Sequence, residues 1–298
     1  MSEDRKDRLD TRAVVLLLTC CALWGLNQVA TKVALAEIPP LLQAALRSLG
    51  AALLVAAWAA WRGIALWQRD GTTRGGLLAG LLFAAEFACI FVGLQFTTAS
   101  RMAVFIYLAP FVVALGMPFI SKSERLRPPQ VAGLVAAFAG VVWAFAEGFV
   151  APAAGPRQWL GDALGIAAAA LWGLTTLVLR ASRLAKAAPE KTLLWQLGVS
   201  GAALAAGAWA AGEGWPAVLT LRSLGPLAFQ TIVVTFASYL TWFWLIRHYP
   251  ATRLSAFTLL TPVFGLLFGA LLLGEPVTAR LLVALAAVAG GIALVNRA

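Results

Sequence analysis

Apolar residues run along this chain in ten stretches of about 20 positions each, separated by short polar segments. A stretch of that length crosses a membrane as an α-helix, because the hydrocarbon core of a bilayer is about 30 Å thick. A β-barrel strand would instead alternate polar and apolar positions over about ten residues, and runs such as LLVAAWAAW at 53–61 do not alternate. The pattern predicts an all-α integral membrane protein with ten transmembrane helices at 13–34, 40–61, 76–96, 101–120, 129–147, 160–180, 191–211, 225–246, 253–273 and 278–296.

Composition agrees with this pattern. The 298 residues are 61% hydrophobic and 12% charged, against about 25% charged residues in soluble domains, and the mean hydropathy is +0.85. Because few residues remain outside the ten spans, no separate soluble domain is expected.

The distribution of positive charge predicts the orientation. With the N-terminus inside, 17 of the 23 Lys and Arg residues fall on the cytoplasmic side, as the positive-inside rule requires for short loops. The six assigned to the outer side are Lys32, Arg47, Arg101, Arg157, Arg222 and Arg280. Both termini are therefore predicted to be cytoplasmic. The net charge of +10 reflects topology and anionic lipid headgroups, and no nucleic-acid partner is expected.

Three segments of the first half of the chain return in the second half. ALWG at 22–25 recurs at 170–173, an offset of 148. TTASRMAVFIYLAP at 97–110 matches YPATRLSAFTLLTP at 249–262, and SERLRPPQVAGLVAAFAGVV at 123–142 resembles GEPVTARLLVALAAVAGGIA at 274–293. Repeats this long indicate a duplicated half-transporter. The predicted division is a tail at 1–12, a first five-helix repeat at 13–147, a linker at 148–159 and a second repeat at 160–296.

An odd number of spans in each half makes the two halves run in opposite directions through the membrane. Inverted repeats place a substrate site near the bilayer midplane, at the interface between the halves, and permit alternating access. A duplicated membrane scaffold without transport is the alternative. Intramembrane polar residues that cluster along one expected pathway favour transport.

The ten spans, the repeated ALWG and the stretch TTASRMAVFIYLAPFVVALGMPFISKSERL resemble the drug/metabolite transporter superfamily. The similarity covers essentially the whole chain and points to the ten-helix EamA-type branch, most closely to the YddG-type amino-acid exporters. Pro276 follows Glu275 where the first repeat has Arg125 after Glu124, a departure from the repeat pattern. The resemblance implies export of amino acids or similar small metabolites across the bacterial inner (cytoplasmic) membrane. Export of other metabolites or drugs by the same fold is the alternative, and the solute, coupling ion and oligomeric state stay open.

Glu86 is the strongest candidate for solute contact. It lies at the centre of LLAGLLFAAEFACIFVGL (77–94), and no other acidic residue lies so deep in a predicted span. A charge at the bilayer centre costs about 2.5–3.5 kcal/mol on insertion scales, so it normally faces a bundle interior or water. The expected role is contact with a substrate ammonium group, or protonation. The alternative is a neutral carboxylic acid bonded to a neighbouring helix.

Polar stripes mark the first and sixth spans. They comprise Trp24, Asn27, Gln28 and Thr31 on the first and Trp172, Thr175 and Thr176 on the sixth. Residues three and four positions apart share a helix face, so both stripes are expected to turn inward and line a pathway. Hydrogen bonding between helices is the alternative. Deeper aromatic residues, Tyr107, Tyr239 and Trp242, could form a π-rich wall for the solute, with simple packing as the alternative.

Pro110 and Pro262 occupy matched positions in the fourth and ninth spans. Each proline removes an N–H and disturbs the preceding turn, so both are predicted as bend points for gating, with a static kink as the alternative.

An intramembrane protease is the rival class, because Gly198-Val199-Ser200-Gly201 matches a G-x-S-G pattern. His248, the sole histidine, lies about half a span from Ser200 in depth, which is too far for a nucleophile and its base. No metal, nucleotide or redox motif occurs, and the odd number of cysteines argues against a disulfide framework. No enzyme activity, cofactor or metal is therefore expected. The expected partners are a small-molecule solute and the lipid bilayer.

Overall fold

The computed structural model describes residues 8–93, 95–97, 102, 105–121, 125–144, 157–273 and 279–296, and every regular element within these ranges is helical. The elements of the first half are α1 (Thr11–Leu35), α2 (Pro40–Trp61), α3 (Thr73–Gly93), α5 (Ala109–Ile120) and α6 (Pro128–Ala144). Those of the second half are α8 (Gln158–Ala181), η2 (Arg183–Lys186), α9 (Pro189–Ala210), α10 (Leu221–Ala228), η3 (Phe229–Ser238), α11 (Tyr239–His248), α12 (Ala251–Phe257), α13 (Leu260–Leu273) and α14 (Ala279–Asn296).

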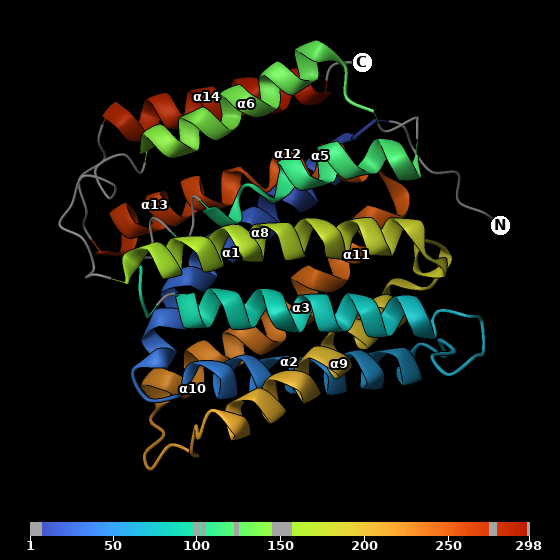
Figure 1. The fold of residues 1–298 in the computed structure, drawn as a ribbon, viewed down its shortest axis with the longest axis vertical. Coiled ribbons are helices and arrows are strands. Elements are labelled where there is room, and N and C mark those ends of the chain that lie inside the picture. The colour runs from blue at the N-terminus through green and yellow to red at the C-terminus, as the bar shows by residue number, and fades with distance from the viewer. Residues whose placement is uncertain are drawn as a thin grey trace.

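Each predicted span contains a described helix, so the prediction of an all-α, ten-helix membrane fold is confirmed. Six of these helices are long and apolar enough to cross a membrane, namely α1, α2, α3, α8, α9 and the continuous segment Leu221–His248. The described helices of the fourth, fifth, ninth and tenth spans are shorter. The helices lie side by side along a common direction, with α6 and α14 at one edge and α2 and α9 at the opposite edge (Figure 1).

The main contacts that helices of the first half make with the second half have counterparts, in which the matching helices of the second half contact the first half. The α3 helix packs against α8 and α9, and its counterpart in the second half, the segment α10–η3–α11, packs against α1 and α2. Likewise α5 packs against α8, and α13 packs against α1. The pairs α6–α14 and α2–α9 join each span to its own counterpart. This pattern of contacts is the one expected of duplicated, inverted halves.

The repeated Trp-Gly pair explains part of this packing. A Cβ atom added at Gly25 of α1 would lie 2.8 Å from the backbone nitrogen of Gly265 in α13. A Cβ atom at Gly173 of α8 would lie 2.5 Å from the Cβ of Val112 in α5. Glycine therefore allows the same close helix approach in both halves, a role typical of small residues in membrane helices.

The eighth span departs from its counterpart because η3 is a π-helix. Matched positions differ by 148 residues at the Trp-Gly pairs but by 152 residues at Thr97 and Tyr249, so the second half carries additional residues between these points. A π-helix holds more residues per turn than an α-helix, since its hydrogen bonds span five residues, and such segments are frequent at functional sites. The π-helix therefore absorbs part of the insertion and makes the two halves unlike at this span.

At the helix ends that are predicted to face outward, two acidic residues make contacts between the halves. Glu213, after α9, accepts hydrogen bonds from the backbone N–H groups of Leu41 and Leu42 at the start of α2. Glu37, before α2, accepts from the backbone and hydroxyl of Thr220 and from the Ser223 hydroxyl at the start of α10. These donors, the Ser223 hydroxyl first, hold the pKa of Glu37 below its ordinary value.

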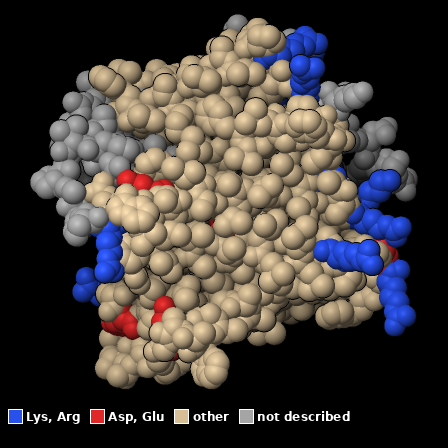
Figure 2. Space-filling model, in the orientation of Figure 1, with Lys and Arg blue, Asp and Glu red and all other residues tan. Residues whose placement is uncertain are grey.

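The opposite, predicted cytoplasmic, ends carry most of the positive charge. Figure 2 shows the Lys and Arg side chains of this face gathered mainly at one end of the helices. There the Lys191 ammonium group lies 2.8 Å from a carboxylate oxygen of Asp70. The hydrogen bonds from Lys191 and then Thr72 hold the pKa of the Asp70 carboxyl group well below its usual range. Arg47, which the sequence assigns to the outer side, is instead buried within α2.

Candidate functional site

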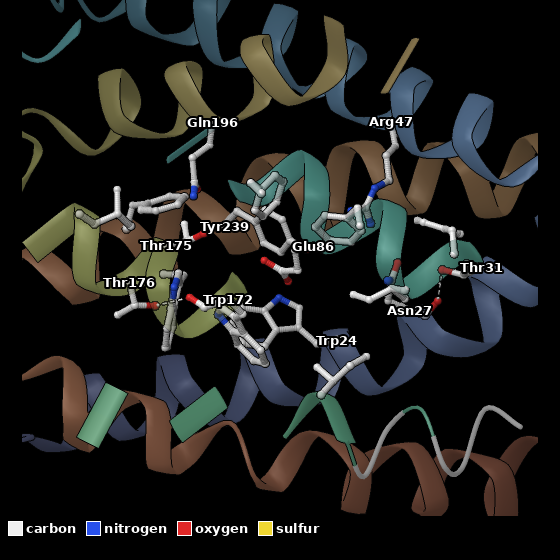
Figure 3. Close-up of a pocket in the computed structure, with 18 of the residues that line it drawn as sticks. Trp24, Asn27, Thr31, Arg47, Glu86, Trp172, Thr175, Thr176, Gln196 and Tyr239 are labelled. Carbon is white, nitrogen blue, oxygen red and sulfur yellow. Dashed lines mark hydrogen bonds between the residues drawn. The ribbon is translucent and has the colours of Figure 1, made fainter. Parts of the chain in front are cut away.

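A pocket lies between the two halves of the protein, and both halves line it. Its empty space, including the part that is open to solvent, is about 980 Å³. Its walls come from α1, α2, α3 and the segment 106–107 of the first half, and from α8, α9 and α11 of the second half (Figure 3). A site at this place matches the interface at which inverted-repeat carriers bind their solutes.

Ten of the residues singled out in the sequence line this one pocket. They are Trp24, Asn27, Thr31, Glu86, Tyr107, Trp172, Thr175, Thr176, Tyr239 and Trp242. The side chain of Gln28 lies outside the described part of the structure. Residues far apart in the sequence thus converge, because α1 and α8 turn their polar stripes toward a shared space.

Glu86 extends into the middle of the pocket. Its side chain is 5% exposed, and Figure 3 shows its carboxylate between the rings of Tyr239 and Trp24. The Oε2 atom accepts no hydrogen bond from the described residues. This oxygen therefore makes no bond to a neighbouring helix within the described residues.

The sequence does not identify Arg47 as a site residue, and the charge count places it on the outer side of the membrane. The structure instead buries Arg47 in the wall of the pocket. It lies inside α2, seven residues after Pro40, and is 1% exposed. Its guanidinium group stacks 3.9 Å above the centre of the Phe87 ring, and it interacts electrostatically with Tyr239 and Glu86. Its Nε and Nη2 atoms have no hydrogen-bond partner among the described residues. A charged residue within a predicted span was the available signal.

Gln196 is the counterpart of Arg47 in the second half. It lies seven residues after Pro189, which begins α9 as Pro40 begins α2. Figure 3 shows Arg47 and Gln196 reaching the pocket from α2 and α9 on either side of Glu86. The amide is 1% exposed, and its Oε1 atom has no partner in the described structure. The two halves thus present a cation and a neutral amide at matched positions.

The stripe on α1 is held by hydrogen bonds to the second half. The Trp24 indole donates to the Ser238 hydroxyl at 2.8 Å, and Thr31 donates to Gln230 at 3.4 Å. The Gln43 amide also donates to Gln230, so Thr31, Gln43 and Gln230 form a polar cluster next to the pocket. Within the described residues, the Oδ1 atom of Asn27 stays unpaired. Helix–helix bonding therefore accounts for part of this stripe, and Asn27 retains a free acceptor.

The polar side chains of the stripe on α8 make their hydrogen bonds within their own helix. The hydroxyls of Thr175 and Thr176 donate to the carbonyls of Leu171 and Trp172, one turn earlier on the same helix. They therefore line the pocket without joining α8 to another helix through these bonds. Thr175 and Thr176 are both buried.

Aromatic rings form a wall of the pocket, in two groups of edge-to-face contacts. The Trp24 ring lies edge to face against Trp242 and Tyr239, with centroids 5.4 Å and 6.1 Å apart. On the other side, Tyr107 contacts Trp172 in the same manner at 5.8 Å. Edge-to-face geometry is favourable for aromatic pairs. The wall can accept an apolar side chain or a cation.

The fourth and ninth spans are interrupted just before the matched prolines. Helix α5 begins at Ala109, immediately before Pro110, after a turn at 107–108. Helices α12 and α13 are separated at 258–259, three residues before Pro262. Tighter bonds from Leu108 to Phe105 and from Leu259 to Ala256 bridge these points. The bends are therefore breaks in the helices, and Tyr107 reaches the pocket from one of them.

Ser200 and His248, the residues of the alternative protease hypothesis, each interact with other groups. The Ser200 hydroxyl is buried in α9 and donates to the carbonyl of Leu197. The His248 ring stacks on Trp244 at the end of α11, and its Nδ1 lies 2.7 Å from the Trp244 carbonyl. Within the described residues, no group of three or more His, Cys, Asp or Glu side chains could hold a metal ion.

Comparison with known proteins identifies the family. The chain is 27% identical to the uncharacterized transporter YvbV of Bacillus subtilis over 96% of this chain and 92% of that one. It is 28% identical to a probable amino-acid metabolite efflux pump of Escherichia coli, covering 89% of this chain and 88% of the pump. A crystal structure with 24% identity covers 96% of both chains with a TM-score of 0.78 and shows the same fold. The model of the EamA-like transporter family matches residues 11–146 and again 159–297, so the chain belongs to this family and is, as its motifs predicted, a membrane transporter rather than an enzyme.

Proposed function

We propose that this multi-pass transporter exports amino acids or similar small metabolites by alternating access through the pocket between its two repeats. The observation that carries this proposal is the position of the pocket, which both halves line and which holds one buried carboxylate and one buried guanidinium group. The Escherichia coli relative is named a probable amino-acid metabolite efflux pump, which supports the choice of solute class.

The proposed repeats span 13–147 and 160–296, with a tail at 1–12 and a linker at 148–159. The proposed solute-binding residues are Glu86, Trp24, Asn27, Gln28, Trp172, Thr175, Tyr107, Tyr239 and Trp242. Pro110 and Pro262 are the proposed bend points, because each follows a break in a span whose counterpart is broken in the same way. The proposed location is the bacterial inner membrane, which the bacterial origin of the two relatives supports.

Transport by purified protein in liposomes tests the proposal. Liposomes loaded with one unlabelled solute are diluted into the same labelled solute, for a panel of amino acids, other metabolites and lipophilic drugs, with and without a pH gradient. Accumulation of an amino acid above that in protein-free liposomes is expected. Accumulation of drugs or unrelated metabolites alone favours the alternative solutes, and no accumulation of any solute contradicts transport by this pocket.

Two variants connect transport to the pocket. Thr175→Trp places a bulky ring into the pocket from α8 and is expected to abolish accumulation. Thr241→Trp adds the same ring at a half-buried position of α11 that does not line the pocket, and it serves as the matched control. Equal activity of the two variants would show that the solute takes another route.

A further inference from the structure

Arg47 and Glu86, which carry opposite charges, line the same pocket, and each keeps side-chain atoms without a hydrogen-bond partner among the described residues. The Nε and Nη2 atoms of Arg47 and the Oε2 atom of Glu86 are all buried, and none has a hydrogen-bond partner among the described residues. Removing a charged group from water costs several kcal/mol unless other groups compensate for the lost hydration. Arg47 and Glu86 therefore have unused bonding capacity, and both residues line the same pocket.

The free atoms of Arg47 form a defined edge. Nε and Nη2 lie on one side of the planar guanidinium group and direct two parallel N–H bonds outward. This fork matches the two oxygens of a carboxylate, which arginine binds in a bidentate manner. Stacking on Phe87 at 3.9 Å, with Phe91 at 5.9 Å, holds the plane of the fork. The edge is therefore preorganised for a carboxylate group.

Glu86 offers the opposite chemistry. A carboxylate accepts hydrogen bonds and pairs with an ammonium group. Among the residues that line the pocket, Arg47 is the one cation and Glu86 the one anion of the described structure. A ligand with a single positive charge would leave Arg47 uncompensated, and a ligand with a single negative charge would leave Glu86 uncompensated. The pair therefore selects a ligand that carries both charges.

We propose that Arg47 and Glu86 together recognise the zwitterion of an α-amino acid with a large apolar side chain. Arg47 binds the carboxylate through its Nε–Nη2 edge, and Glu86 binds the ammonium group. The side chain packs against the rings of Trp24, Trp172 and Tyr239. This inference rests on the proposed function, and it names Arg47 as a specificity-determining residue that the sequence-based site lacked.

Ligands that lack one charge test the inference on the purified full-length protein. Binding is followed by quenching of tryptophan fluorescence, because Trp24, Trp172 and Trp242 line the pocket. L-phenylalanine is compared with phenethylamine, which lacks the carboxylate, and with 3-phenylpropionate, which lacks the ammonium group. L-leucine is compared in the same way with 3-methylbutylamine and 4-methylpentanoate. Each amino acid is expected to bind at least about 10-fold more tightly than either analogue, the weight of one charged hydrogen bond.

Variants assign each charge to its residue. Arg47→Gln, which reproduces the amide of Gln196, is expected to weaken L-phenylalanine about 10- to 100-fold and to leave phenethylamine nearly unchanged. Arg47→Lys keeps the charge but loses the fork, so it should retain part of the discrimination and also tests folding. Glu86→Gln should weaken L-phenylalanine relative to 3-phenylpropionate. Arg222→Gln, on the outer surface, is the control.

The outcomes separate this inference from the proposed function. Equal binding of amino acids and their analogues, or equal weakening of all three ligands by Arg47→Gln, would overturn zwitterion recognition, even if the liposomes accumulate a solute. Binding of no amino acid would overturn it as well. If no solute of the liposome panel moves although amino acids bind with the expected pattern, the recognition site stands and the transport proposal fails.

Discussion

Arg47 of α2 and Gln196 of α9 lie at matched positions, each seven residues after the proline that begins its helix, and both reach one pocket from opposite halves. The backbone is repeated, whereas the chemistry is not. Glu86 adds to this difference. The offset of 152 residues that matches Thr97 with Tyr249 pairs Glu86 with Ser238, so an acid in the first half corresponds to a hydroxyl in the second. A twofold-related frame with unlike side chains gives a solute one preferred orientation between the halves.

Replacing Gln196 with leucine is expected to separate stability from transport. The Oε1 atom is buried and unpaired within the described residues, and an unsatisfied buried group costs about 1–3 kcal/mol. Gln196→Leu should therefore keep or raise the unfolding temperature while solute accumulation in liposomes falls. An unchanged rate of accumulation would show that this amide does not contact the solute.

The bond between Trp24 and Ser238 is expected to join α1 to the π-helix. Trp24→Phe keeps a ring in the aromatic wall but removes the indole N–H that donates to Ser238 at 2.8 Å. The loss should be about 0.5–1.5 kcal/mol of unfolding free energy. Ser238→Ala should cost a similar amount, and the double variant should cost less than the two losses combined, because the shared bond is lost only once. Fully additive losses would contradict the coupling.

Alanine in place of Gly25 or Gly173, the glycines of the two Trp-Gly pairs, is expected to destabilise the protein. At Gly25 the added methyl group meets backbone atoms, with Gly265 nitrogen at 2.8 Å and Thr261 oxygen at 2.9 Å. At Gly173 it meets the side chain of Val112, which can shift more readily. Overpacking of this kind costs about 1–3 kcal/mol, so Gly25→Ala should lower the unfolding temperature more than Gly173→Ala.

Gly198 supplies the matched control for these variants. It lies in the interior of α9 with no heavy atom within 4 Å of an added Cβ. Alanine there should be neutral or stabilising by about 0.5–1 kcal/mol, because glycine is the weaker helix former. Destabilisation of the same size at Gly198 would show that backbone freedom, rather than close packing, requires glycine at all three positions.

Much of the fold follows from the sequence because a bilayer requires apolar spans of nearly fixed length. The repeated Trp-Gly pair marks the positions where α1 and α8 each make a close contact with another helix. The offset between matched segments changes from 148 to 152, so the second half carries extra residues between Gly173 and Tyr249. Their conformation as a π-helix depends on packing against α1 and α2, which the sequence does not express.

The site could be predicted only in part. Glu86, Trp24 and Trp172 lie near the centres of their predicted spans, where depth alone points inward. Arg47 lies two turns from the end of its helix, and from such a position a long side chain can extend to the membrane surface. What fixes it inside is the ring of Phe87 on another helix, a contact that no pattern within α2 reveals.

Glu37 gives the fold a pH dependence at its outer end. Hydrogen bonds from Ser223 and Thr220 favour its ionised form and hold its pKa below the ordinary value of 4.5. A carboxyl group whose pKa is lower in the folded state stabilises the fold at pH values above 4.5, and this contribution is lost as the pH falls through the folded-state pKa.

Substitution of Glu37 tests this dependence. Glu37→Gln should lower the unfolding temperature in detergent by a constant amount above about pH 5, and the difference from the unmodified protein should shrink and vanish as the pH falls below 4.5. Ser223→Ala removes the leading donor and brings the folded-state pKa of Glu37 back toward 4.5, so less stability should be lost as the pH falls, and the loss should be complete at a higher pH than in the unmodified protein. A difference between Glu37→Gln and the unmodified protein that persists unchanged into the acidic range would mean that the glutamate acts by packing and not by its charge.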